Sequence, residues 1–550
     1  MDRNNKENNK EINIDDIIFK TTLNNKPILF SGIFALIAYI LQDVVFPNTF
    51  ATFTTDVPNF INTISFQSVM GIILPYLIAE FLFYVNNILV SHNFPKIELE
   101  IVREITDQTI ESMKTSKKQI NTNEYIMNLK KVIESKGFYF LIVSHIVPTI
   151  LVAIGVTYNF MKNDYKTGLL VLLIFLIFGY VSYKFEHNCI ESSVQTEKNL
   201  NIFYDEIQDV VANIDTVITA NSKEKELNNI SNEMTNVYKK YSQSEISSSE
   251  TVYKLHISSL IIAIIICGIA IKMYMNNPND IDKTLLVSTC IMSILFMQYY
   301  NSAINKMKYT VHYFGKFRDI GKYFSEFKLD EELNKQKLII IDGNIKFDDV
   351  SLIYPERTIF SNLSFNIEGQ RKTGIIGEIG SGKTSILKMI LGLIKYTGKI
   401  FIDNQDISKC SQESIIVQIA YIPQHPKIFN KTIYYNISYG TDYTRQDIMN
   451  FINKINFKEF DNIFPTGLDT RVGKEGSKLS GGQKQIIALI RALIQDKKIL
   501  LIDEPTSSLD KNTKNIILNL IQNIRNKTVV VVTHDSDVKQ IVDQVIDLNS

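Results

Sequence analysis

The sequence contains no tryptophan, only four cysteines, and no excess of charge of either sign among its 550 residues. Cys189, Cys267, Cys290 and Cys410 are scattered without a Cys-x-x-Cys pair, which argues against a disulfide scaffold and a structural zinc site. Lys and Arg total 58, as do Asp and Glu, so the chain lacks the basic excess that is usual in nucleic-acid-binding proteins. The polar N-terminal tail, residues 1–26, lacks the form of a cleaved signal and is too acidic for a typical organelle transit peptide.

Long apolar runs, separated by polar stretches, fill the first half of the chain. A helix needs about 20 mostly apolar residues to cross a bilayer. Six such runs with few charges are hard to bury in a soluble protein, so they predict an all-α transmembrane domain over residues 27–305. The six predicted spans are residues 28–46, 68–90, 138–160, 168–183, 255–274 and 285–300.

The distribution of Lys and Arg predicts the orientation of these spans, because both residues are enriched in cytoplasmic connections. The first connection contains none of them, the second contains eight and the fourth contains seven. We therefore expect both termini and the two long connections, the second and the fourth, to be cytoplasmic.

The two long connections repeat apolar residues at helical spacing, over residues 98–113 and 200–217. The second to fifth spans are therefore expected to continue as helices beyond the membrane. Short segments at their tips, residues 122–126 and 213–221, would lie against something cytoplasmic.

A charged stretch, residues 306–337, follows the last span and is predicted to be a helical linker. From Leu338 onward, short β-branched runs such as 499–502 and 528–533 alternate with amphipathic helical stretches. This alternation is typical of an α/β domain with a largely parallel sheet, here residues 338–550. The sequence thus predicts a multidomain protein with an α-helical membrane domain and a C-terminal α/β domain.

Residues 377–384 match the pattern GxxxxGK[ST] between an apolar strand and a helical stretch, the context that a phosphate-binding loop requires. Backbone N–H groups of such a loop surround phosphate oxygens, and the helix N-terminus adds a favourable dipole. Lys383 would bridge the β- and γ-phosphates, and the Thr384 hydroxyl would ligate Mg²⁺. The predicted nucleotide-binding residues of this loop are Gly377, Glu378, Ile379, Gly380, Ser381, Gly382, Lys383, Thr384 and Ser385.

An apolar strand farther along the chain ends in two carboxylates, Asp503 and Glu504. Asp503 at the strand tip suits a direct or an indirect contact to Mg²⁺. Glu504 would then orient or deprotonate the attacking water. A surface Asp-Glu pair that closes a strand is the plainer alternative, which the phosphate loop disfavours.

Between these motifs lies Leu479-Ser-Gly-Gly-Gln483, at the start of a helical run. It makes a second anion-accepting helix N-terminus, which is useful if it comes from a partner domain across the nucleotide. With the phosphate loop before it and the Asp-Glu strand after it, the pentapeptide resembles the signature of ATP-binding cassette (ABC) transporters. Residues 338–550 resemble the nucleotide-binding domain, a P-loop NTPase fold, of that family.

The resemblance implies roles for further residues. Tyr354 matches the aromatic residue that stacks on adenine, although a tyrosine of the strand core is the alternative. Gln424 matches the glutamine that senses Mg²⁺ and the attacking water, and His534 matches the histidine that contacts the γ-phosphate. Residues 507–510 match the loop that runs along the dimer interface, and the signature contributes Ser480, Gly481, Gly482 and Gln483 to nucleotide binding.

One position departs from the family pattern. Exporters of the family usually carry Gly-Glu-x-Gly before the signature, and this chain has Gly473-Lys474-Glu475-Gly476. The acidic residue is displaced by one position, which puts in doubt how the domain pairs with its membrane half.

The six spans and the C-terminal cassette resemble an exporter-type half-transporter. The resemblance implies ATP-driven export by alternating access, with ATP and Mg²⁺ as cofactors. Because the catalytic elements all lie on one chain, a homodimer is favoured over pairing with a paralogous half-transporter. The alternative is an ATP-gated channel or regulatory subunit that does not pump, but the intact Glu504 and His534 favour turnover.

The sequence does not identify the substrate. Ionisable residues inside spans are candidates for a translocation path, because such groups are costly in lipid. Glu80, His145 and a polar side of the sixth span are these candidates, and interhelical hydrogen bonding is the alternative for each. Asp43 is expected at the outer boundary. The polar residues of the sixth span are Thr289, Cys290, Ser293, Gln298 and Asn301.

Overall fold

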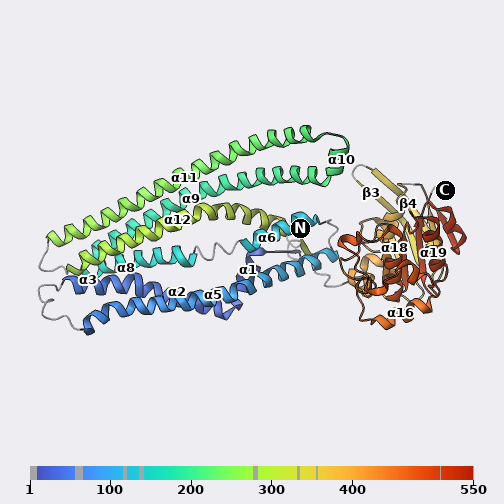
Figure 1. The fold of residues 1–550 in the computed structure, drawn as a ribbon, viewed down its shortest axis with the longest axis horizontal. Helices are drawn as coiled ribbons and strands as arrows, with labels where there is room; N and C mark the ends of the chain where they lie inside the picture. Colours follow the sequence, from blue (N-terminus) through green and yellow to red (C-terminus); the bar gives the residue numbers. More distant parts are fainter. Residues whose placement is uncertain are drawn as a thin grey trace, which may run out of the picture. The chain divides into compact units, whose positions relative to one another are not determined.

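The computed structural model describes residues 9–55, 66–115, 120–134, 142–276, 283–330, 335–354, 357–378, 380–507 and 509–548. They divide into two compact units, one mainly of Asn9–Ser112 with Gln119–Leu329 and the other mainly of Asp330–Ser550 (Figure 1). The first unit is helical and the second is α/β, so the predicted fold class is confirmed.

The first unit consists of helices and one short pair of strands. Its elements are β1 (Asn9–Glu11), α1 (Ile14–Asn24), α2 (Lys26–Ile40), the π-helical segment η1 (Leu41–Val45), α3 (Phe46–Thr55), α5 (Phe66–Thr115), α6 (Thr122–Glu134), the π-helical segment η2 (Ile142–Ile146), α8 (Val147–Asn163), α9 (Tyr165–Ala212), α10 (Ile214–Thr219), α11 (Lys223–Asn276), α12 (Lys283–Ser325) and β2 (Lys328–Asp330).

Among the described residues, five helical stretches are long and apolar enough to cross a membrane: Lys26–Thr55, Val69–Met113, Val143–Asn163, Tyr165–Lys184 and Lys223–Asn276. They overlap the first five predicted spans, although residues 138–141 of the third lie outside the described residues. The sixth predicted span, 285–300, is helical within α12 but is not among the five. The amide of Gln298 and several hydroxyl groups lower the hydropathy of this stretch.

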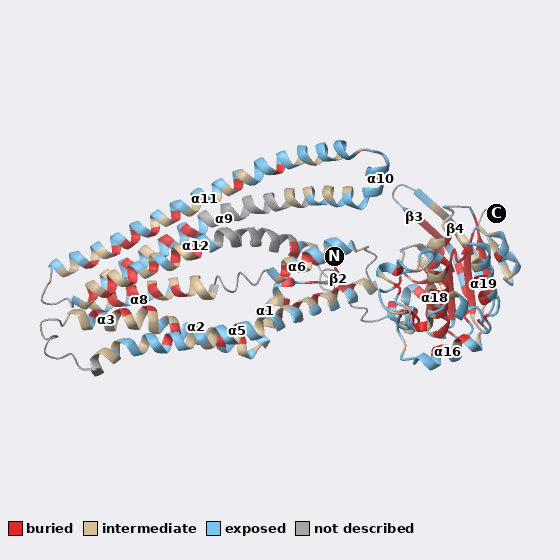
Figure 2. Ribbon diagram, in the orientation of Figure 1, coloured by how far each residue is buried: buried red, intermediate tan, exposed pale blue. Residues whose placement is uncertain are grey.

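Many residues of these helices are exposed (Figure 2), and large apolar side chains are found among both the exposed and the buried residues. On α9, for example, Leu173, Leu176 and Ile177 are more than half exposed, while Phe178 is buried among Phe296 and Tyr300 of α12. In water such an exposed apolar surface would be unfavourable, but in a bilayer it faces hydrocarbon. The unit therefore has the surface of a multi-pass membrane domain.

The ends of the first unit differ from the predicted tail and linker. Asn9–Glu11 forms β1, which pairs with β2, and Ile12 and Ile14 of the tail are buried. The helix predicted for residues 306–337 ends at Ser325, because β2 then takes an extended conformation beside β1. A strand partner distant in sequence thus overrides the local charge pattern.

The predicted tip segments lie at connections between helices. Residue 122 begins α6, and α10 fills most of the segment predicted as 213–221, between α9 and α11 (Figure 1). The helices α9 and α11 contain 48 and 54 residues, far more than a bilayer needs.

The second unit contains two sheets and the helices around them. Its strands are β3 (Ile345–Tyr354), β4 (Arg357–Ile367), β5 (Lys372–Ile376), β6 (Thr397–Ile402), β7 (Gln405–Asp406), β8 (Ile419–Ile422), β9 (Ile499–Asp503), β10 (Thr528–Thr533) and β11 (Gln544–Asp547). Its α-helices are α13 (Lys383–Ile390), α14 (Gln412–Gln418), α15 (Ile433–Ile437), α16 (Arg445–Lys454), α17 (Phe460–Ile463), α18 (Gly481–Ile494) and α19 (Lys511–Gln522), and its 3₁₀ turns are η3 (Ile407–Lys409), η4 (Gly467–Asp469), η5 (Lys474–Gly476) and η6 (Ser536–Gln540).

A parallel sheet with the order β11-β5-β10-β9-β8 forms the centre of this unit, and an antiparallel sheet with the order β4-β3-β6-β7 accompanies it. Along β10, Val529 and Val531 belong to one apolar core, and Val530 and Val532 belong to the other. Alternate residues of a strand point to opposite faces, so both faces of the parallel sheet are covered. The carboxyl ends of β5, β9 and β10 meet at one edge, where the predicted motifs lie.

Candidate functional site

The segment between β5 and α13 has the backbone of a glycine-dependent loop. Gly380 and Gly382 have φ angles of 86° and 89°, which L residues with a side chain rarely adopt. A Cβ atom on Gly382 would also lie 2.5 Å from Ile359 Cγ2 and 2.7 Å from Phe360 Cε1. Gly382 directly precedes α13, so it turns the chain into the helix. Ile379 lies outside the described residues.

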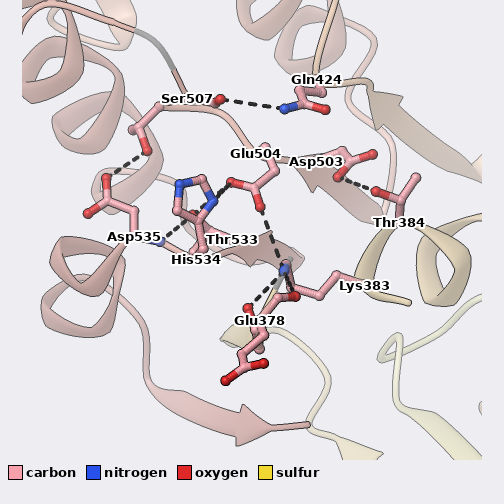
Figure 3. Close-up of polar contacts among 12 residues, drawn as sticks. Glu378, Lys383, Thr384, Gln424, Asp503, Glu504, Ser507, Thr533, His534 and Asp535 are labelled. Carbon is pink, nitrogen blue, oxygen red and sulfur yellow. Dashed lines mark hydrogen bonds and ion pairs between the residues drawn. The ribbon is translucent and has the colours of Figure 1, made fainter. Parts of the chain in front are cut away.

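The ammonium group of Lys383 points back into this loop (Figure 3). Its Nζ donates hydrogen bonds to the carbonyl oxygens of Gly377 and Glu378, each over 2.8 Å. The same nitrogen lies 3.9 Å from Glu504 Oε1, and the side chain is only 7% exposed. A buried cation is thus fixed between the loop and the end of β9.

Asp503 joins the loop to the central sheet. Its Oδ1 accepts a hydrogen bond from the Thr384 hydroxyl over 3.0 Å, and its Oδ2 accepts one from Tyr421 over 3.2 Å. Burial raises the pKa of Asp503, and these two hydrogen bonds partly offset that effect. Tyr421 lies on β8, which is the neighbour of β9. The sequence around Tyr421 is an apolar strand and did not predict the contact with Asp503.

Glu504 is the first residue after β9 and has a φ angle of 45°, a strained conformation for a residue with a side chain. Its N–H donates to the carbonyl oxygen of Val532 over 2.9 Å, which holds the turn against β10. Its Oε2 lies 2.8 Å from His534 Nδ1 and accepts a hydrogen bond from Thr533 over 3.3 Å. The sequence motifs pointed to Glu504 and His534, but not to Thr533.

Gln424 follows β8 and approaches the turn after Glu504. Its Nε2 donates to the Ser507 hydroxyl over 3.4 Å, and its carbonyl oxygen accepts a hydrogen bond from Gln485 of α18 over 2.7 Å. Gln424 is therefore connected both to the segment predicted to line a dimer interface and to the helix of the signature. Ser508 of that segment lies outside the described residues.

Tyr354, the residue predicted to stack on adenine, ends strand β3 and is 44% exposed. It pairs in register with Arg357 of β4. The Arg357 guanidinium donates to the carbonyl oxygen of Gly380 over 3.3 Å, which links this strand pair to the phosphate loop. The exposed ring favours the binding interpretation of Tyr354 over that of a core residue.

The signature begins helix α18 and caps it. Ser480 Oγ accepts a hydrogen bond from the N–H of Gln483 over 3.2 Å, and Gln483 Oε1 accepts one from the N–H of Ser480 over 2.8 Å. This reciprocal pair is a capping box, which satisfies helix-terminal donors. The side chains of Ser480 and Gln483 thus fix the helix start, and Gly481 and Gly482 form its first turn.

The two glycines of the signature have different surroundings. A Cβ atom on Gly482 would lie 2.3 Å from Thr513 Cγ2 of α19, whereas one on Gly481 would have only Leu509 Cδ2 nearby, at 3.9 Å. Thr513 cannot easily move away, because its hydroxyl donates to Asp510 Oδ2 over 2.6 Å. Gly482 therefore permits the close approach of α18 and α19, and Gly481 leaves the start of the helix open.

We expect Gly482→Ala to destabilise the domain and Gly481→Ala to leave its stability nearly unchanged. Overpacking a closed contact typically costs about 1–3 kcal/mol, which exceeds the gain of up to about 1 kcal/mol from replacing glycine with alanine in a helix. Scanning calorimetry of the two purified variants would measure the difference. Equal melting temperatures would contradict the predicted clash.

The segment before the signature takes an unusual backbone conformation. Glu475, the displaced acidic residue, has a φ angle of 51°, and Gly473 has one of 76°. The turn η5 that contains Lys474 and Glu475 is exposed apart from Gly476. The position at which this chain departs from the family pattern before the signature thus lies in a surface turn.

Comparisons with known proteins place this geometry in a family. Residues 360–507 match the family model described as ABC transporter. The mitochondrial iron-sulfur clusters transporter ATM1 of Debaryomyces hansenii is 39% identical over 209 residues, which are 37% of this chain and 30% of that protein. The ATP-dependent lipid A-core flippase of Francisella tularensis is 28% identical over 216 residues, 38% of this chain and 36% of that protein. The chain spans about a third of the length of these relatives.

A solved structure extends the similarity of fold to the membrane unit. The structure of a bacterial Atm1-family ABC exporter with ATP bound has a TM-score of 0.77, covers 95% of this chain and 94% of its own, and is 21% identical. The comparison thus covers both units. The chain has the fold of an ABC exporter half-transporter, and residues 360–507 of its C-terminal domain match the ABC transporter family.

Proposed function

We propose that this chain exports a substrate across a membrane by alternating access, driven by ATP binding and hydrolysis at a dimer of its C-terminal domains. The observation that carries the proposal is the convergence of Lys383, Thr384, Asp503, Glu504 and His534 at one edge of the sheet. Relatives that are named for different cargoes share the cassette, so the cassette supports ATP chemistry and leaves the substrate open.

The donors around the loop suit a nucleotide with Mg²⁺. Thr384 Oγ1 and Asp503 Oδ1 are hard oxygen donors 3.0 Å apart, the ligand type that Mg²⁺ prefers. Gln424, which reaches the same end of the sheet, is the third candidate for this ion. Bound Mg²⁺ would neutralise charge on the phosphate oxygens.

The chain's own groups then have separate tasks. Lys383 is placed to donate to phosphate oxygens, and the exposed Tyr354 offers a ring face for the adenine. Glu504 is placed to orient a water molecule or accept its proton, and His534 and Thr533 hold the carboxylate in one orientation.

A second copy of the chain completes the proposed site. The open first turn of α18 presents backbone N–H groups and the positive end of a helix dipole, which favour an anion. Supplied by the partner, this turn would meet the γ-phosphate opposite Lys383. Because both Glu504 and His534 are present, we favour a homodimer with two working sites over a paralogous pair or a regulatory subunit.

The proposal includes the membrane topology. We infer that α12 provides the sixth span and that both termini lie in the cytoplasm, as the distribution of Lys and Arg predicts. Which membrane hosts the chain is left open.

The proposed function is tested by reconstituting the chain alone in liposomes and measuring steady-state phosphate release from ATP with Mg²⁺ and with EDTA. We expect turnover that depends on Mg²⁺, together with a dimeric mass by native mass spectrometry. A folded, ATP-binding protein without turnover would overturn the homodimeric pump and direct attention to a missing partner chain or a regulatory role.

A further inference from the structure

A completely buried carboxylate, Asp43, lies within the first helical stretch that is long and apolar enough to cross a membrane. Asp43 belongs to η1, the π-helical segment between α2 and α3. The three elements form one helical stretch that continues to Thr55. Its Oδ1 accepts a hydrogen bond from the Tyr299 hydroxyl of α12 over 3.1 Å. Its Oδ2 is buried without a hydrogen-bond partner in the described part of the chain. A π-helical turn inside a longer helix frequently marks a functional site.

The described residues supply no positively charged partner for this carboxylate. Among the residues that the structure describes, no ion pair involves Asp43, and Tyr299 is the only group that hydrogen-bonds it. Burying an ionised carboxylate is costly unless a cation lies beside it. One buried carboxylate oxygen, Oδ2, is therefore left uncompensated among the described residues.

Aromatic rings surround the same position. The Tyr39 ring, one turn before Asp43, packs edge-on against Tyr299 with centroids 6.1 Å apart and against Phe83 of α5 with centroids 4.7 Å apart. Phe46, three residues after Asp43, packs on Tyr76 of α5 at 5.6 Å. Tyr76 is 37% exposed, and Tyr39, Phe46, Phe83 and Tyr299 are only partly buried, so a ligand can reach these rings. We call this set, with Asp43, the Asp43 cluster.

A second acidic residue lies beside the cluster. The Tyr76 hydroxyl is hydrogen-bonded to Glu80, the second acidic residue in the apolar part of these helices. Basic residues occur at helix ends, as Lys162, Lys166, Lys272 and Lys283 do, and also within α12, where Lys306 lies near His145 of η2.

We propose that the Asp43 cluster is a substrate site for lipophilic organic cations, which deepens the proposed export function and rests on it. Aromatic ring faces attract cations, and such rings with a carboxylate form the surroundings in which quaternary ammonium groups are recognised. Oδ2 of Asp43 supplies the counter-charge, and the rings accept the apolar part of the ligand. An anion of the same shape would meet the negative ring faces and an unpaired carboxylate oxygen.

The alternative is that Asp43 has a purely structural role. In that case Asp43 only ties η1 to α12 through Tyr299, and the charge of a ligand has no influence on binding. Two probes of equal shape and opposite charge separate the roles: tetraphenylphosphonium, a cation, and tetraphenylborate, an anion.

The experiment is equilibrium dialysis of both probes against the full-length chain in lipid nanodiscs, with empty nanodiscs as the blank. We expect the wild-type chain to bind the phosphonium in excess of the blank and in preference to the borate. Asp43→Asn is expected to weaken phosphonium binding roughly tenfold or more and to leave borate uptake unchanged. Asp107→Asn makes the same substitution at an exposed position of α5 outside the cluster, so it is the matched control and is expected to retain phosphonium binding within about threefold.

Equal uptake of the two probes by the wild-type chain would overturn the proposal, whether or not the variants fold. Equal phosphonium binding by a folded Asp43→Asn variant would do so as well. The dialysis needs no ATP, so an inactive ATPase would contradict the export function without changing this result. Conversely, ATP turnover with no phosphonium preference would leave export standing and remove this substrate class.

Discussion

Replacing Glu504 with glutamine is expected to abolish steady-state ATP hydrolysis while ATP binding persists. The amide keeps the size of the side chain but cannot accept a proton from water, a contribution of about 10²–10⁴-fold to the rate. His534 Nδ1, 2.8 Å from Oε2, can still contact the amide oxygen, so the turn after β9 is expected to keep its form. Phosphate release by the reconstituted chain should therefore fall at least about 100-fold.

Glu459→Gln is the matched control for this substitution. Glu459 is exposed at the start of α17, and its side chain makes no capping hydrogen bond. Its variant should hydrolyse ATP at the wild-type rate. If Glu504→Gln retained more than about a tenth of the wild-type rate with intact ATP binding, another group would have to be the base.

Replacing Lys383 with methionine is expected to remove most of the affinity for ATP. The substitution keeps much of the side-chain volume and removes a buried cation, a kind of truncation that costs about 2–5 kcal/mol in charged hydrogen-bonded pairs. This corresponds to a Kd for ATP raised at least about 30-fold. Equilibrium binding of a fluorescent ATP analogue to the purified chain would measure it.

Lys395→Met is the control for that measurement, because Lys395 is exposed beyond α13. The Lys383 variant also loses two hydrogen bonds to loop carbonyl oxygens, so calorimetry must show that it remains folded. A folded Lys383→Met protein with wild-type ATP affinity would refute the assignment of this lysine to phosphate binding.

The motifs of the C-terminal domain could be predicted because their chemistry is local. A phosphate loop needs glycines at fixed spacing before a helix, and Gly380 and Gly382 have the left-handed backbone that this spacing implies. Tyr421 and Thr533 could not be predicted, because their contacts with Asp503 and Glu504 arise from the neighbouring strands β8 and β10. The order of the strands in the sheet decides which strands are neighbours, and the sequence of one segment does not determine that order.

The membrane unit shows a similar division. Hydropathy located all five helical stretches that are long and apolar enough to cross a membrane, since a bilayer imposes a length on any helix that crosses it. The place of Asp43 at the outer boundary stays a prediction. The buried position of Asp43 depends on packing against Tyr299, more than 250 residues away in the chain, which hydropathy does not detect.

The lengths of α9 and α11 have a mechanical consequence. At about 1.5 Å per residue, their 48 and 54 residues extend roughly 40–50 Å beyond a hydrocarbon core of about 30 Å. Neither helix contains a proline, whereas α5 contains Pro75 and Pro95. We expect the pair of helices joined by α10 to act as a stiff lever whose pivot lies where the pair enters the lipid. The arm inside the lipid is about 30 Å long and the arm outside it is roughly 40–50 Å long. When α10 moves sideways, the other end of the pair, at the opposite surface of the bilayer, would therefore move roughly two thirds as far, and the force there would be larger in proportion.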